Sequence, residues 1–242
     1  MKSKEDIYSE IYNKHVFSSI PENNEGFCLE FFEWELFESE HIPNIDSFKI
    51  IEMIEKVSKN LLLFENINLN LNKNFDEFEM MTISNMSKAA SKVIWNLFKP
   101  NKPVFIKELN KLVTENQALV PGSFRNKNIF VKGVKKEFKF LSEERIDEKL
   151  NKLLSQANTS EEIALHLLLF IITQQVFFDG NKRTAFLIAN KILLENFYKF
   201  ILLGETNIDK FNLLLNDLYN NFKYEKYNNI FNFLKEQIKD LK

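Results

Sequence analysis

Five consecutive residues combine the chemical groups that can hold a phosphate: Asp179, Gly180, Asn181, Lys182 and Arg183. Glycine lets the backbone approach a ligand closely or take a positive φ, and the lysine and arginine supply positive charge. The aspartate offers the hard oxygen ligand that a phosphate-bound Mg²⁺ prefers. This order of residue types predicts an anion-binding turn, with Asp179 on the metal and the other four residues around the phosphate.

Two helical stretches flank this turn. Residues 163–178 are apolar on nearly every side, which is typical of a helix at the centre of a bundle, and Thr159 with Glu162 has the capping-box spacing of a helix start. After the turn, apolar residues recur at helical spacing, which predicts a second helix that begins near Asn181 and packs one face inward. The first amides of such a helix lack intrahelical partners and lie at the positive end of its dipole, so they favour a bound phosphate.

The string from Phe177 to Ala185 resembles the signature of the Fic family, also called Fido, whose core motif reads His-x-Phe-x-Asp/Glu-Gly-Asn-Gly/Lys-Arg. Residues 121–125, Pro-Gly-Ser-Phe-Arg, are similar to the segment that precedes the family's β-hairpin flap. The resemblance covers roughly residues 75–234. It implies an all-α fold, a Fic-type helical bundle with a small β-hairpin flap at about 128–140 and the motif at 175–185. Helical spacing at 208–218 and 227–241 would complete the bundle.

Members of this family bind a nucleoside triphosphate with Mg²⁺ and transfer its AMP to a hydroxyl of a target protein, while the Doc branch transfers a phosphoryl group. The resemblance therefore implies Mg²⁺ and ATP, or another nucleotide, as cofactors. It also implies a protein target that docks on the flap at Ile129, Phe130 and Val131 by strand addition. A purely structural hairpin is the alternative.

Two residues depart from the family pattern. Gln175 stands where the family has its catalytic histidine, and glutamine does not titrate near neutral pH. A general base typically contributes about a hundred- to ten-thousandfold in rate, so efficient transfer is not expected. Phe186 stands where AMP-transferring members have a second arginine for the γ-phosphate, and the Asn-Lys-Arg-Thr-Ala ending resembles the Doc-like branch.

Glu65 is a candidate inhibitory residue. The Phe64-Glu65-Asn66 stretch faintly resembles the family's inhibitory helix, Ser/Thr-x-x-x-Glu-Gly/Asn, whose glutamate pairs with the second motif arginine. Leu61 replaces the hydroxyl residue of that pattern, and Phe186 leaves Glu65 without the family's arginine partner. An ordinary surface glutamate is the alternative.

Composition limits the remaining classes of function. A net charge of −2 gives no broad basic face, so nucleic acid is not an expected partner. The single cysteine, Cys28, excludes an internal disulfide, and the polar opening residues resemble no signal peptide, which predicts a cytoplasmic protein or one secreted without a conventional signal. Residues 163–178 are too short to span a bilayer, so no membrane helix is expected.

The sequence predicts an unassigned N-terminal helical region at 1–66 and a Fic-like domain at 67–242. Three functions stay open. The first is a degenerate or regulatory member, a pseudoenzyme that kept the phosphate site and flap but lost the base. The second is an active AMP-transferase or Doc-like phosphotransferase that modifies a protein hydroxyl. The third is a helical interaction protein without a nucleotide. A homodimer and a separate antitoxin-like partner also stay open.

Overall fold

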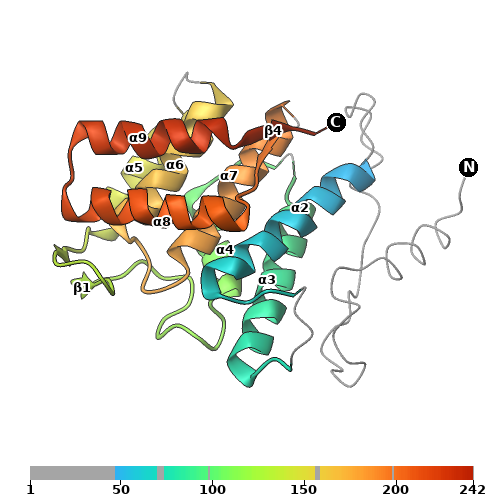
Figure 1. Ribbon diagram of the computed structural model, residues 1–242, viewed down its shortest axis with the longest axis horizontal. Coiled ribbons are helices and arrows are strands. Elements are labelled where there is room, and N and C mark those ends of the chain that lie inside the picture. The colour runs from blue at the N-terminus through green and yellow to red at the C-terminus, as the bar shows by residue number, and fades with distance from the viewer. Residues whose placement is uncertain (1–46, 70–73, 98, 156–158, 198, 242) are drawn as a thin grey trace, which may run out of the picture. The chain divides into compact units, whose positions relative to one another are not determined.

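The computed structural model describes residues 47–69, 74–97, 99–155, 159–197 and 199–241 (Figure 1). The described helices and strands are α2 (Ser47–Leu62), η2 (Leu63–Glu65), α3 (Glu77–Trp95), α4 (Pro103–Val113), β1 (Ile129–Phe130), β2 (Glu137–Phe138), α5 (Glu143–Ser155), α6 (Ser160–Gln174), α7 (Asn181–Phe197), β3 (Lys199–Ile201), α8 (Glu205–Asn220), α9 (Tyr224–Glu236) and β4 (Ile238–Asp240). The predicted helical class is confirmed, because the described strands form only small antiparallel pairs.

Residues 46–242 form one compact unit. The predicted division at residue 66 falls inside this unit, because α2 packs against α3 and α7. As a division of function it stays a prediction. Most of the predicted N-terminal region, with Cys28, lies outside the described residues.

The centre of the fold is the hairpin of α6 and α7. The predicted capping box is present, since Thr159 Oγ1 accepts from the amide of Glu162 at 3.3 Å and the Glu162 carboxylate accepts from the amide of Thr159 at 3.4 Å. The helix is shorter than predicted, because Gln175 takes a left-handed conformation with φ 48° and ends α6 at Gln174. The second helix begins at Asn181 as predicted, but it is buried on nearly every side rather than on one face.

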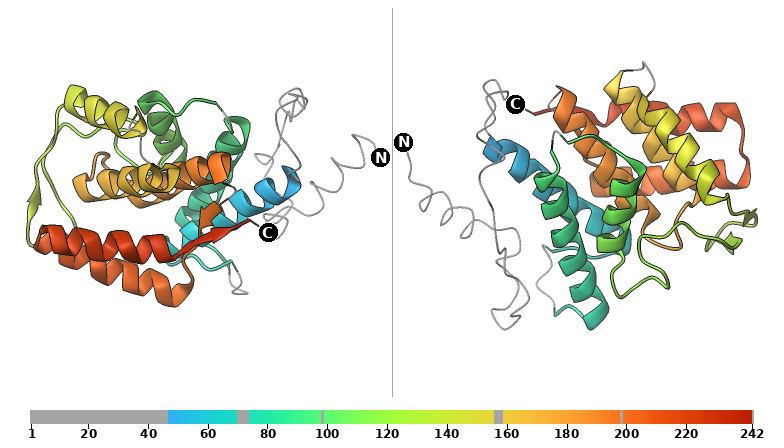
Figure 2. Two further views of the ribbon diagram at one scale, coloured as in Figure 1. Left: turned by 90° about the horizontal axis from the view of Figure 1, so that it is seen from above. Right: turned by 180° about the vertical axis from the view of Figure 1, so that it is seen from behind.

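Two groups of helices surround this hairpin. On one side α2, α3 and α4 contact α7, and on the other α5 and α9 contact α6 while α8 packs along α9. The view from behind in Figure 2 shows α3 and α4 in green next to each other, with α5 and α6 in yellow beyond them. The loop between α6 and α7 is thereby held between helices that lie far apart in the sequence.

The predicted flap is a short antiparallel hairpin. Ile129 of β1 pairs with Phe138 of β2, and Phe130 pairs with Glu137. A second antiparallel pair, β3 with β4, was not predicted. It forms where helical spacing had suggested that the last helix continues to residue 241, so that expectation was wrong beyond Glu236. Within the described residues, no helix combines the length and apolar character needed to cross a membrane.

Candidate functional site

The predicted anion-binding turn lies between α6 and α7 and has a conformation that requires glycine. Gly180 has a φ of 70°, and a Cβ at this position would lie 2.4 Å from Cγ2 of Thr114 and 3.0 Å from Cγ1 of Val113. Its amide donates to Oδ1 of Asp179 at 2.6 Å. The turn therefore presses its backbone against the end of α4, where no larger residue fits.

Asn181 is buried and holds the turn together from inside. Its Oδ1 accepts from the amide of Phe177 at 2.9 Å, and its Nδ2 donates to the carbonyl of Phe177 at 2.9 Å. Because this side chain is turned back into the loop, Asn181 offers its backbone amide rather than its side chain to a ligand. Its amide and those of Lys182 and Arg183 belong to the first turn of α7, where amides lack helical partners.

Arg183 is almost completely buried, with 1% of its surface exposed. Its Nη1 donates to the carbonyl of Val113 at 3.2 Å, and its Nη2 lies 3.9 Å from Oδ2 of Asp179. Oε1 of Glu65 lies 3.1 Å from Nε of Arg183, but this contact is an ion pair without hydrogen-bond alignment, so Nε has no hydrogen-bond partner. Glu65 therefore pairs with the first motif arginine, while the family's second arginine position holds Phe186 as the sequence indicated.

Lys182 supplies the second positive charge of the turn. Its Nζ donates to Oδ1 of Asn212 at 2.9 Å and lies 5.3 Å from the ring centre of Phe64. Burial lowers the pKa of Lys182, while the nearby Glu65 carboxylate acts in the opposite direction. The lysine is thus fixed at the inner wall of the site by an amide and an aromatic face.

A pocket of about 580 Å³ opens in front of this turn. Its lining residues are Phe64, Glu65, Val131, Lys132, Val134, Gln175, Phe178, Asp179, Gly180, Asn181, Lys182, Arg183, Asn212, Leu215, Asn216 and Tyr219. All of the predicted phosphate and metal residues are therefore brought together, and Glu65 joins them. Of the three predicted flap residues only Val131 lines the pocket, while Phe130 is 71% exposed.

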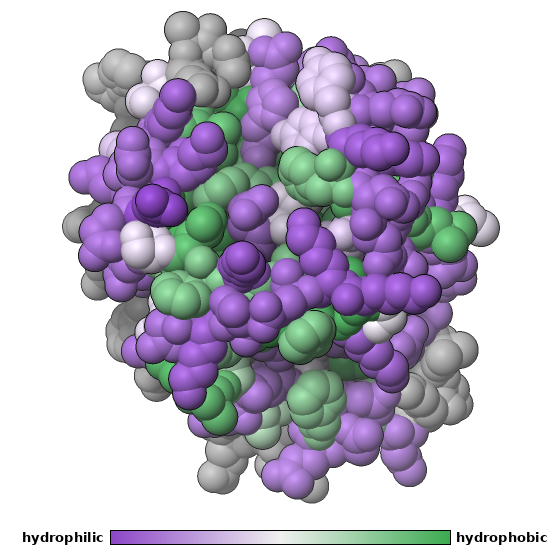
Figure 3. Space-filling view, turned by 90° about the vertical axis from the view of Figure 1, so that its left-hand side faces the viewer, coloured by the Kyte–Doolittle hydropathy of each residue, from purple (hydrophilic) through white to green (hydrophobic). Residues whose placement is uncertain are grey.

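The surface around the flap is mixed. The face in Figure 3 is the left-hand side of Figure 1, where β1 lies, and it is mostly hydrophilic with separate apolar spots. Docking of a target on the flap stays a prediction.

Residues 101–193 match the sequence model of the Fic/DOC family. This part of the chain belongs to that family. The matched Fic region contains α4, the Pro-Gly-Ser-Phe-Arg segment, the flap and the turn, and the resemblance read from the sequence is confirmed.

The structure agrees with this result. A Fic domain containing signaling protein from Bacteroides thetaiotaomicron VPI-5482 superposes with a TM-score of 0.54 over 80% of this chain and 86% of that chain. The two sequences are 18% identical, so this likeness concerns the fold alone. No curated protein matches this chain in sequence.

Gln175 opens the Fic motif, and its side chain is fixed by hydrogen bonds. Its Nε2 donates to the carbonyl of Ile172 at 2.8 Å and to the hydroxyl of Tyr219 at 2.7 Å, while its Oε1 accepts from Asn181 Nδ2 at 3.2 Å. Burial also raises the pKa of Tyr219, so this hydroxyl stays protonated at neutral pH. Neither side chain can act as a base near neutrality.

His166, the one histidine among the described residues, does not line the pocket. It lies on the α9 side of α6, where its Nδ1 is 2.6 Å from the hydroxyl of Tyr227 and its ring packs against Phe231. His166 thus packs between α6 and α9, away from Gln175.

Arg125, whose role sequence reasoning missed, connects the Fic motif to the flap. Its guanidinium donates to the carbonyls of Gln174 and Gln175 at the end of α6 and to three carbonyls of the flap segment, those of Lys127, Phe138 and Lys139. The side chain is buried, and this desolvation lowers its pKa. The signal that could have revealed it is its place at the end of the Pro-Gly-Ser-Phe-Arg segment.

Asn110 is a second residue that sequence reasoning missed. From the buried face of α4 its Nδ2 donates to the carbonyl of Asp179 at 2.9 Å and to Oγ1 of Thr184 at 3.1 Å, and its Oδ1 accepts from the amide of Gly122 at 3.1 Å. It thereby fixes the carbonyl just before Gly180. A polar residue among the apolar positions of this amphipathic helix was the available signal.

Proposed function

We propose that this chain binds a nucleotide or another phosphorylated ligand in the pocket, and that it is a degenerate or regulatory Fic protein with lost or weak transferase activity. The observation that carries this proposal is the contrast within one motif. All five residues of the expected anion-binding turn line the pocket, whereas Gln175, at the position of the family's base, is an amide that is already hydrogen-bonded to Ile172 and Tyr219.

The phosphate site is supported by three features of the α7 start. Its first amides face no helical partner, and Gly180 gives the chain the positive φ and the close approach to α4 with which it enters this helix. Lys182 and Arg183 both line the pocket.

Asp179 fits Mg²⁺ only in part. Its side chain is half exposed and lines the pocket, but within the described residues no group of three or more His, Cys, Asp or Glu side chains could hold a metal ion. Mg²⁺ commonly binds one or two carboxylates together with ligand phosphates, so Asp179 suits an ion that arrives with the nucleotide. Such an ion would neutralise phosphate charge.

An active AMP-transferase or Doc-like phosphotransferase is the alternative. It is favoured by the flap, since Val131, Lys132 and Val134 line the same pocket as the turn. A protein docked along β1 would therefore present its side chains next to a bound phosphate. The third candidate, a helical interaction protein without a nucleotide, requires that the turn serve folding only.

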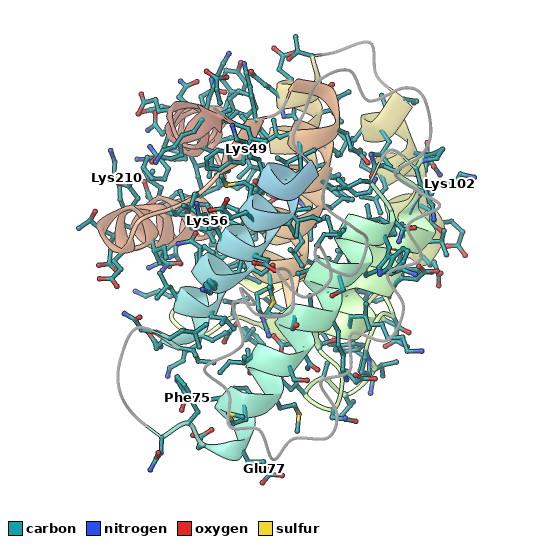
Figure 4. All side chains as sticks on the ribbon, turned by 90° about the vertical axis from the view of Figure 1, so that its right-hand side faces the viewer. Lys49, Lys56, Phe75, Glu77, Lys102 and Lys210 are labelled. Carbon is teal, nitrogen blue, oxygen red and sulfur yellow. The ribbon has the colours of Figure 1, made fainter. Side chains whose placement is uncertain are left out.

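Calorimetric titration with AMP and with ATP, each with and without Mg²⁺, tests the binding proposal. The variants are Asp179→Ala and Lys182→Met, with Lys210→Met as the matched control. Lys210, labelled in Figure 4, lies on α8, its Nζ is 5.0 Å from the ring centre of Phe233, and it does not line the pocket. We expect Lys182→Met to weaken nucleotide binding and Lys210→Met to leave it unchanged. Absence of binding in the wild type would favour the interaction protein.

A further inference from the structure

We infer that the pocket selects ligands with a single phosphate group on an uncharged organic part over nucleoside triphosphates. This inference rests on the proposed function, which places a phosphorylated ligand in the pocket. It goes further because it assigns the class of ligand from the charges and side chains that line the walls.

The charges of the pocket suit one phosphate. Among its lining residues, Lys132, Lys182 and Arg183 are cationic, and Glu65 and Asp179 are acidic. Of the three cations only Lys182 and Arg183 lie at the start of α7, because Lys132 belongs to the exposed loop of the flap. A phosphate at the α7 amides would meet both of these cations. Further phosphates would add negative charge next to Glu65, and next to Asp179 wherever no Mg²⁺ is bound to it.

The next turn of α7 offers no cation. Phe186 is buried and packs against Phe64 and Phe211, with ring centres 5.3 Å and 5.5 Å away. The rings of Phe64 and Phe211 are 5.8 Å apart, so the three rings form one cluster. Phe64 presents this cluster to the pocket. A second or third phosphate against this wall would lose water without gaining a partner, which is unfavourable for a charged group.

The rest of the pocket suits a neutral organic group. Leu215, Val134 and Phe178 supply apolar surface, and the side-chain amides of Asn212 and Asn216 supply uncharged hydrogen-bonding groups. Asn212 is already oriented by its contact with Lys182. Apolar side chains next to uncharged hydrogen-bonding groups can hold and orient a neutral organic group. A nucleoside monophosphate has both the phosphate and the neutral part.

The test ranks two series of ligands by calorimetry on the full chain, with and without Mg²⁺. The first series is AMP, ADP and ATP, and the second is inorganic phosphate and tripolyphosphate, which removes any dependence on the base. In each series that binds, we expect the ligand with one phosphate to bind more tightly than the ligand with three, by about fivefold or more. This is the size of effect that one uncompensated charge near a carboxylate produces. Lys182→Met should weaken AMP or phosphate binding about tenfold, and Lys210→Met should not.

The outcomes separate this inference from the proposed function. If ATP binds more tightly than AMP, or tripolyphosphate more tightly than phosphate, the single-phosphate inference is overturned while the phosphate site stands. If no ligand of either series binds, both are overturned. Equal loss of binding in Lys182→Met and Lys210→Met would place the ligand outside this pocket and also overturn both.

Discussion

Oε1 of Glu65 lies 3.1 Å from Nε of the buried Arg183. This ion pair links η2, before α3, to the first turn of α7. The side chain of Glu65 is 33% exposed and that of Arg183 is 2% exposed, and both residues line the pocket. A phosphate that approaches Arg183 would therefore compete with a charge of the same sign.

Glu65→Gln should tighten the binding of AMP or phosphate by about fivefold, because the competing charge is removed while the shape is kept. The same change should lower the free energy of unfolding by about 1 kcal/mol, less than for a fully buried pair, because Glu65 is partly exposed. Calorimetry and urea unfolding measure the two effects. Glu115→Gln is the control, since it removes the exposed ion pair with Lys88 outside the pocket. Unchanged affinity in Glu65→Gln would contradict an inhibitory role for Glu65.

Gly180→Ala should lower the free energy of unfolding by about 3 kcal/mol, because it combines a positive φ with a clash against Thr114. Gly133→Ala separates these two causes. Gly133 also has a positive φ of 81°, but no atom lies within 4 Å of the place that its Cβ would take, so only the conformational cost of about 1 kcal/mol remains. Thermal unfolding of both variants measures the difference. Equal effects would show that the turn does not press against α4.

Arg125→Lys should loosen the flap and destabilise the fold by about 3 kcal/mol. Lysine keeps the charge but cannot reach carbonyls on both the flap and the end of α6, and the buried oxygens would lose their partners. Hydrogen exchange should rise at Phe138 and in the segment after Gln175. The exposed Arg145→Lys serves as control. Unchanged protection at both places would show that Arg125 does not couple them.

Stability should depend on pH through Glu55 of α2. Burial, with a smaller contribution from Glu52, raises the pKa of Glu55 to about 7 against the opposing effect of Lys59. The folded state thus holds this proton more tightly than the unfolded chain. The proton on Glu55 therefore adds to the free energy of unfolding. This gain is fully present below the unfolded pKa of 4.5 and is lost as the pH rises through about 7. Glu55→Gln should flatten the fall in urea midpoint between about pH 5 and about pH 8, whereas the exposed Glu52→Gln should retain it.

Gln175→His should raise transferase activity about a hundredfold or more if the absent base limits the reaction. Histidine tolerates a positive φ better than most residues, so the backbone at this position accepts it. The readout is transfer of labelled AMP from ATP to proteins of a cell extract, with a rate that rises as the imidazole loses its proton near pH 6.5. Efficient labelling by the wild type that is lost in Asp179→Ala would show that another base exists.

The elements around the turn were predicted well because their signals are local. The capping box at Thr159, the helical spacing after Asn181 and the Asp-Gly-Asn turn each act within a few residues. The end of α6 was misplaced because Gln175 ends the helix in a left-handed conformation that Gly or Asn usually takes. The β3–β4 pair was missed because each strand is only three residues long and pairs across two helices.

The supporting contacts of the site could not be predicted. Arg125 binds backbone carbonyls, which every residue has, so its partners leave no trace in the sequence. The pairing of Glu65 with Arg183 depends on how η2 packs beside α7. The family pattern pointed to the second arginine position instead, where this chain has Phe186.

The most direct test of the central claim, that the start of α7 binds phosphate, is an NMR titration of the isotope-labelled protein with AMP. We expect the amide resonances of Asn181, Lys182 and Arg183 to shift in a saturable way, and Lys182→Met to weaken the apparent affinity about tenfold. Saturable shifts confined to residues outside the pocket, or no shifts at all, would contradict the claim.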